Sequence, residues 1–129
     1  MMRHLVFVYG TLRKGEKNHY LIRKAECVER NAYTHGKLYD TGFHYPAMVL
    51  DEDEKVYGEL YRVDDDMLEI LYRLEGYEPG RESNLYETIE AEVFSESGSY
   101  EAILFVAGNQ TDLLKKRIPS GDWILYKRT

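Results

Sequence analysis

Cysteine, proline and long apolar runs are scarce in this chain of 129 residues, which has one Cys and three Pro. The lone Cys27 excludes a disulfide within the chain and suits a reducing compartment, so we expect a cytoplasmic protein. No stretch approaches the roughly 18 apolar residues that cross a bilayer. Arg3 and His4 lead directly into a strand-like run and not into the apolar core of a secretory signal. We therefore expect no membrane partner.

Positively charged residues are also fewer than negatively charged ones. The 17 Lys and Arg residues face 23 Asp and Glu residues, which gives a formal net charge of −6. No basic cluster is longer than Lys115-Lys116-Arg117. Proteins that bind nucleic acids present a basic face, so we expect no nucleic-acid partner. The length suits a single domain, 1–129, that is large enough to bury a core.

Motifs for metal binding and for nucleophilic catalysis are missing. The four histidines show no i, i+4 pair and no H-E-x-x-H spacing, and Cys27 has no partner cysteine. No G-x-S-x-G motif for a serine hydrolase is present. We therefore expect no metal and no cofactor. The histidines are His4, His19, His35 and His44.

Two segments have helical spacing. Asp64 is a capping residue for a helix whose apolar stripe ends before Gly76, where the spacing predicts the end of the helix. A second helix is expected over 18–25, with Asn18 as its cap. The stripe of the first helix consists of Met67, Leu68, Leu71 and Leu74, and that of the second of Leu21, Ile22 and Ala25.

Most of the remaining chain has the pattern of β-strands. Alternating or continuous apolar runs separated by turn residues favour an α+β fold whose sheet is able to curl into a barrel. An acidic turn is expected at 51–54, a loop at 78–84 and a turn at 95–99. The expected strands cover 5–9, 33–39 with a break at Gly36, 47–50, 56–63, 86–94 and 100–106.

A glycine-bounded loop, Gly10-Thr11-Leu12-Arg13-Lys14-Gly15, follows the first strand. Such a loop leaves backbone N–H groups without ladder partners and can turn them toward an anionic ligand. The G-x-x-x-x-G skeleton resembles a P-loop, but Glu16 and Lys17 follow where a P-loop has Lys and then Ser or Thr. This excludes a nucleotide triphosphatase and leaves open a binder of one carboxylate or amide, or a plain turn.

Glu75 stands at the end of the first predicted helix. A carboxylate there faces the negative end of the helix dipole, and any burial disfavours its charged form further. A raised pKa is what a carboxyl group needs to act as both base and acid near neutral pH. The alternative is an ordinary exposed glutamate, a residue common on helices.

Taken together, an ordered set of motifs resembles the gamma-glutamylcyclotransferase-like family across nearly the whole chain. The set begins with the first strand and its glycine loop and ends at Trp123, the one tryptophan of the chain. Its members are Val8-Tyr9-Gly10-Thr11-Leu12-Arg13 with Asn18-His19, Tyr45-Pro46-Ala47, Val56-Tyr57-Gly58-Glu59-Leu60-Tyr61, Leu74-Glu75-Gly76-Tyr77 with Tyr86 downstream, and Ile118-Pro119-Ser120-Gly121-Asp122-Trp123.

The resemblance implies a small mixed β-barrel flanked by two short helices. It implies an enzyme that cyclises the γ-glutamyl group of a small γ-glutamyl peptide or amine, releasing 5-oxoproline and a free amine without a cofactor. It assigns the acid/base role to Glu75. The residues it assigns to substrate binding are Tyr9, Gly10, Thr11, Leu12, Tyr86 and Tyr126.

Two other functions stay open at this point. One is a non-catalytic binder of a small metabolite, which is favoured by Thr88 because many members of the family carry arginine there. The other is acyl transfer, in which an external amine accepts the γ-glutamyl group. Fold alone does not separate these functions from cyclisation.

Overall fold

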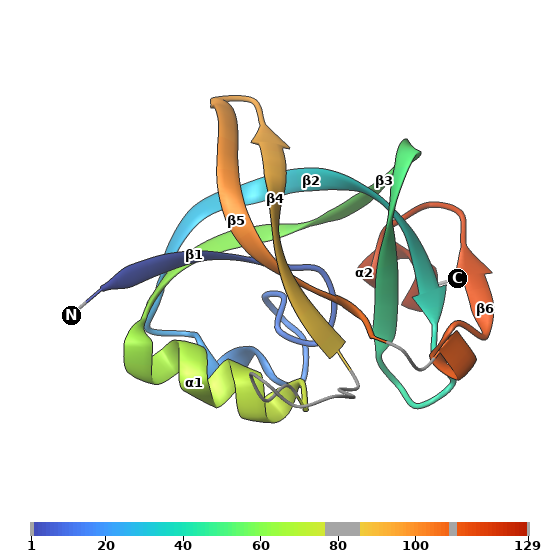
Figure 1. The fold of residues 1–129 in the computed structure, drawn as a ribbon, viewed down its shortest axis with the longest axis horizontal. Coiled ribbons are helices and arrows are strands. Elements are labelled where there is room, and N and C mark those ends of the chain that lie inside the picture. The colour runs from blue at the N-terminus through green and yellow to red at the C-terminus, as the bar shows by residue number, and fades with distance from the viewer. Residues whose placement is uncertain (1, 77–85, 109–110, 129) are drawn as a thin grey trace.

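The computed structural model describes residues 2–76, 86–108 and 111–128 (Figure 1). The predicted loop at 78–84 lies outside them. The elements in chain order are β1 (Arg3–Val8), the 3-10 turn η1 (His19–Leu21), β2 (Glu26–Asp40), β3 (Pro46–Asp64), α1 (Asp65–Leu74), β4 (Tyr86–Ser95), β5 (Gly98–Ala107), the 3-10 turn η2 (Thr111–Leu113), β6 (Lys116–Ile118) and α2 (Trp123–Lys127).

The strands form one mixed sheet in the order β3-β1-β5-β4-β2-β6. An additional pairing of β3 with β2 closes β3, β1, β5, β4 and β2 into a ring, and β6 pairs with β2 outside it. In Figure 1, α1 lies along one side of this ring. The β1–β5 pairing is parallel, and the other pairings are antiparallel. The predicted α+β class is therefore confirmed, and the described helices include none long and apolar enough to cross a membrane.

β1 lies between β3 and β5 and is buried on both faces. Phe7 and the following Tyr9 belong to one apolar cluster, whereas Val6 and Val8 belong to another. This division follows from the period of two along a strand. Leu71 of α1 packs in the second cluster with Val6 and Val8. β1 therefore runs through the core, and the glycine loop follows directly at its end.

The strongest predicted helix is confirmed as α1. Its cap is Asp64, whose side-chain Oδ1 accepts a hydrogen bond from the N–H of Met67 at 2.9 Å. Glu75 is the C-cap of the helix. Gly76 follows with φ of 67°, a left-handed conformation that suits glycine. The helix therefore ends where the sequence places its end.

The prediction of a helix over 18–25 is wrong. Only His19–Leu21 has helical structure, a 3-10 turn, and Asn18 makes no side-chain cap. The Asn18 side chain donates instead to Thr11 Oγ1 at 2.9 Å, and the backbone repeats i, i+3 bonds that a 3-10 turn makes. The second helix beside the sheet is α2, in the tail.

The acidic turn predicted at 51–54 lies inside β3. The pairing of β2 with the residues on either side of 51–54 shows why this acidic segment resembles a turn in the sequence. His35 pairs with Lys55, whereas the next residue of β2, Gly36, pairs with Leu50. The four residues between Leu50 and Lys55 thus have no ladder partner on β2 and form a bulge. The turn predicted at 95–99 is shorter, since β4 ends at Ser95 and β5 begins at Gly98.

Candidate active site

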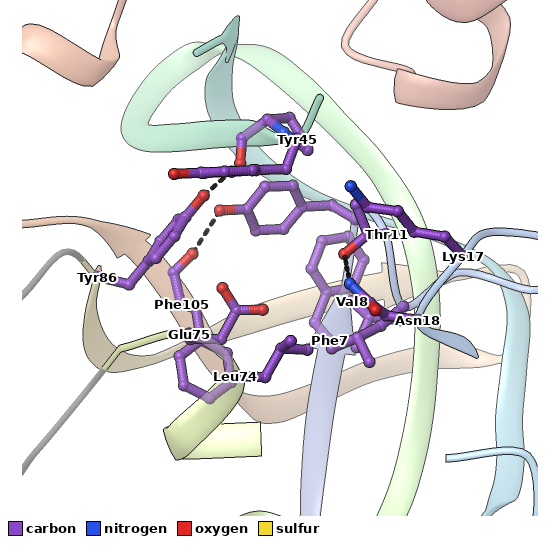
Figure 2. A pocket seen from close by; sticks show the side chains of 14 residues that line it. Phe7, Val8, Thr11, Lys17, Asn18, Tyr45, Leu74, Glu75, Tyr86 and Phe105 are labelled. Atoms are coloured by element: carbon purple, nitrogen blue, oxygen red, sulfur yellow. Dashed lines mark hydrogen bonds between the residues drawn. The ribbon is translucent and has the colours of Figure 1, made fainter. Parts of the chain in front are cut away.

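A cavity of about 250 Å³ lies where β1 ends and the glycine loop begins (Figure 2). It is bounded by this loop, by the start of β3, by the first residue of β4 and by the end of α1. Its lining residues are Phe7, Val8, Tyr9, Gly10, Thr11, Leu12, Lys17, Asn18, Tyr45, Pro46, Leu74, Glu75, Tyr86 and Phe105.

Glu75 reaches this cavity because α1 ends there. Its backbone N–H bonds to Leu71 O at 2.9 Å, and Figure 2 shows its carboxylate turned toward the interior of the pocket. Burial raises the pKa of the Glu75 carboxyl to about 7. The predicted upward shift is confirmed, and its cause is desolvation of the charged form. An ordinary exposed glutamate does not describe this residue.

The loop Gly10–Leu12 offers hydrogen-bond donors and no free acceptors. Each of its carbonyl oxygens already has a partner, whereas none of its three N–H groups has one within the described part of the chain. Unpartnered donors from consecutive residues make a site for an anion or a developing oxyanion. The carbonyl bonds are Arg13 N to Gly10 O (3.1 Å), Asn18 N to Thr11 O (2.9 Å) and His19 Nδ1 to Leu12 O (2.9 Å).

A buried carboxylate behind the loop holds it in place. Glu59 is only 4% exposed, and it accepts bonds from Arg13 Nε at 3.1 Å and from the backbone N–H of Lys14 at 2.9 Å. Tyr61 OH also donates to it at 2.7 Å. Arg13 in turn bonds Asp122, the cap of α2, at 3.0 Å. The loop is therefore tied to β3 and to the tail.

Sequence reasoning missed this role of Glu59, because the alternation along 56–63 puts Glu59 on the same side as Tyr57, which is 38% exposed. The strand is in fact buried on both faces near its pairing with β1, where Val8 and Glu59 are partners. An available signal was the charge complementarity between Glu59 and Arg13, which stand in two of the family motifs. Buried carboxylates require such a partner.

Tyrosines form one wall of the cavity and use their hydroxyl groups on backbone carbonyls. Tyr9 OH donates to Phe105 O at 2.6 Å, and Tyr86 OH donates to Pro46 O at 2.6 Å. Burial raises the pKa of both phenols. Tyr45 also lines the cavity, with its ring 6.2 Å from that of Tyr86. The sequence alone marks Tyr45 only as part of a family motif and assigns it no role in the site.

Replacing Tyr86 with phenylalanine is expected to lower the free energy of unfolding by about 1 kcal/mol, because the Pro46 carbonyl loses its donor in a buried setting. Urea denaturation of the two proteins measures the difference. Tyr57→Phe is the matched control, since Tyr57 is 38% exposed. Equal losses in both variants would contradict a structural role for the Tyr86 hydroxyl.

Tyr126 and Thr88 lie outside this cavity. Tyr126 lines a second cavity of about 520 Å³, and its hydroxyl donates to Asp40 Oδ2 at 2.7 Å. The two cavities share Thr11 and Lys17 in their linings. The structure therefore brings Tyr9, Gly10, Thr11, Leu12 and Tyr86 together with Glu75 and sets Tyr126 apart, so its contact with substrate stays a prediction.

Thr88 pairs with Phe105 across β4 and β5 and lines neither cavity. Thr88, which stands where many family members carry arginine, therefore contributes no side chain to either lining. For a metal, the described ranges contain no group of three or more His, Cys, Asp or Glu residues placed to hold an ion.

Comparison with known proteins finds one family and several relatives. The family model described as gamma-glutamyl cyclotransferase, AIG2-like, matches residues 6–125. The chain is 42% identical over 104 residues to a protein of Halalkalibacterium halodurans named as a candidate gamma-glutamylcyclotransferase, covering 80% of this chain and 91% of that protein. It is 39% identical over 123 residues to the gamma-L-glutamyl-butirosin B gamma-glutamyl cyclotransferase of Niallia circulans, covering 95% and 76%.

A solved structure shares the fold. The crystal structure of YkqA from Bacillus subtilis superposes with a TM-score of 0.77 at 30% identity. The match covers 99% of this chain and 44% of that one.

Proposed function

Because the chain belongs to the gamma-glutamyl cyclotransferase, AIG2-like family, we propose that it cyclises the γ-glutamyl group of a small γ-glutamyl compound. The products are 5-oxoproline and a free amine. The observation that carries this proposal is a single cavity that holds both the Glu75 carboxyl, with a pKa of about 7, and the donor-only loop Gly10–Leu12.

The substrate supplies the nucleophile, which accounts for the lack of a catalytic serine or cysteine motif in the chain. Glu75 takes a proton from the α-ammonium group of the γ-glutamyl moiety, and the resulting amine attacks the γ-carbonyl carbon. A C–N bond closes the five-membered ring, and the original γ-amide C–N bond breaks. In total the α-nitrogen loses two protons and the leaving nitrogen gains two, and Glu75 relays protons between them.

The Gly10–Leu12 loop supports this reaction in two ways. Its unpartnered N–H groups bind the α-carboxylate or the oxyanion that develops on the γ-carbonyl. The cavity also keeps the γ-glutamyl chain folded so that amine and carbonyl meet, an orientation effect that reaches about 7–11 kcal/mol in well-oriented systems. Neither contribution requires a metal or a cofactor.

A panel of γ-glutamyl peptides and γ-glutamyl amines tests the proposal. We expect at least one of them to yield 5-oxoproline by mass spectrometry, with the free amine in equal amount. The control is the α-linked isomer of the same dipeptide, in which the γ-carbonyl is no longer an amide, so that it releases no amine. A new γ-glutamyl amide without 5-oxoproline would indicate transfer to an external amine. Binding without any product would indicate a non-catalytic binder, and either result would overturn cyclisation.

A further inference from the structure

The cavity around Glu75 also presents a side-chain hydroxyl, that of Thr11, whose direction is set by a neighbouring amide. Asn18 Nδ2 donates a hydrogen bond to Thr11 Oγ1 at 2.9 Å, and both residues line the cavity (Figure 2). A threonine hydroxyl has one proton to donate and two lone pairs that accept. Because the Asn18 amide occupies a lone pair, the hydroxyl proton has to point toward a different acceptor.

That proton has no acceptor within residues 2–76, 86–108 and 111–128, where the bond from Asn18 is the one hydrogen bond of Thr11 Oγ1. Thr11 lines the second cavity as well, so its side chain stands beside open volume. The backbone N–H groups of Gly10–Leu12 are also without partners in the described chain. The Thr11 hydroxyl therefore adds a fourth donor to those three.

The backbone of Asn18, and not its side chain, closes the loop. Its N–H donates to Thr11 O at 2.9 Å, and its carbonyl accepts from the N–H of Leu21 at 3.1 Å. The side chain makes no cap for the 3-10 turn η1. Neither the turn nor the loop closure thus requires an amide at this position. The bond of that amide to Thr11 Oγ1 points instead to a role in orienting the hydroxyl.

We propose that Asn18 is a positioning residue, which makes the Thr11 hydroxyl donate its proton to a negatively charged oxygen of the γ-glutamyl group. The inference rests on the proposed cyclisation. Two such groups occur in that reaction: the α-carboxylate, and the γ-carbonyl oxygen as the ring closes. Hydrogen bonds to charged oxygens are stronger than those between neutral groups. A hydroxyl already held in the donating direction needs no reorientation when the charge arrives.

Asn18→Asp tests the direction of the hydroxyl. A carboxylate is nearly the same size as the amide but only accepts hydrogen bonds, so it draws the Thr11 proton to itself and leaves lone pairs facing the substrate. We expect kcat/KM for the most rapidly cyclised compound of the γ-glutamyl panel to fall by about 10–100-fold, the range for a hydrogen bond to a charged group. Asn31→Asp, the same change at an exposed residue of β2 outside both linings, should stay within about twofold of wild type.

Thr11→Val separates the effect of the hydroxyl from that of the added negative charge. Valine has nearly the shape of threonine without the hydroxyl, and we expect kcat/KM to fall by about tenfold. In the Thr11→Val protein, Asn18→Asp should cost about fivefold or less, a charge effect at a partly exposed site, because no hydroxyl is left to turn. A higher KM with unchanged kcat would assign the bond to the α-carboxylate, and a lower kcat would assign it to the γ-carbonyl oxygen.

The remaining outcomes separate this proposal from the function on which it rests. An equal factor for Asn18→Asp with and without the Thr11 hydroxyl would overturn the proposal, since the change would then act through charge or folding. Wild-type kcat/KM in Thr11→Val would overturn it without any Asn18 variant, since the hydroxyl would make no contact with substrate. In both cases wild-type protein still releases 5-oxoproline, so cyclisation stands. If wild-type protein converts no compound of the panel, cyclisation itself fails, and the assignment of Thr11 and Asn18 fails with it.

Discussion

Replacing Glu75 with glutamine is expected to lower kcat for 5-oxoproline release by about 10²–10⁴-fold, the usual contribution of a general acid–base residue. Glutamine keeps the size of the side chain and its place at the end of α1, but it cannot accept or return a proton. Because the carboxylate acts as the base, wild-type kcat/KM should rise with pH and level off above the Glu75 pKa of about 7. Initial rates from pH 4 to 9 measure both effects.

The matched control is Glu69→Gln on the same helix. Its side chain is 65% exposed and pairs with Arg73 four residues on, so it carries the same chemical change away from the cavity. We expect wild-type kcat and the same acid limb near pH 7 from this control. Near-wild-type turnover by a folded Glu75→Gln protein would remove Glu75 from the mechanism. An acid limb near pH 4.5 would show that burial does not shift the working carboxyl.

Local sequence signals were sufficient to predict those site residues whose position depends on a single strand, helix or loop. The apolar run of β1 and the glycines after it predicted the strand and its loop. The Asp64 cap, the apolar stripe and Gly76 together predicted α1 and placed Glu75 at its end, and Asp64 and Gly76 have those roles in the structure. Caps, stripes and left-handed glycines depend on neighbours within a few residues, which is why sequence reveals them.

Contacts between distant segments were not predictable in the same way. Arg13 joins Glu59 and Asp122, which lie 46 and 109 residues away along the chain. The failure of the 18–25 helix has the same origin, because the Asn18 amide bonds the glycine loop and does not cap a helix. Tertiary partners override local propensity at both places. A family resemblance could name the motifs but could not show which side chains meet.

The same Glu75→Gln change is expected to stabilise the fold in alkaline solution. The folded Glu75 carboxyl has a pKa of about 7, against an ordinary value of 4.5. Below pH 4.5 the Glu75 carboxyl is protonated in both the folded and the unfolded protein, so the cost of desolvating its charged form has no effect on stability. Between pH 4.5 and 7 the unfolded chain ionises first, so wild-type stability falls at about 1.4 kcal/mol per pH unit. Above pH 7 the free energy of unfolding of the wild-type protein has fallen by about 3 kcal/mol. The Glu75→Gln protein does not lose this stability, because glutamine does not ionise.

Urea unfolding of both proteins at pH 4.5 and at pH 8 measures this difference. We expect similar free energies of unfolding at pH 4.5 and an advantage of about 3 kcal/mol for Glu75→Gln at pH 8. Glu69→Gln should show a difference that barely changes with pH, because an exposed carboxylate is well solvated. A constant offset for Glu75→Gln at both pH values would mean that the carboxyl is not desolvated. A gain confined to high pH would show that the fold gives up stability to keep this proton-transfer group buried, as expected where activity and stability compete.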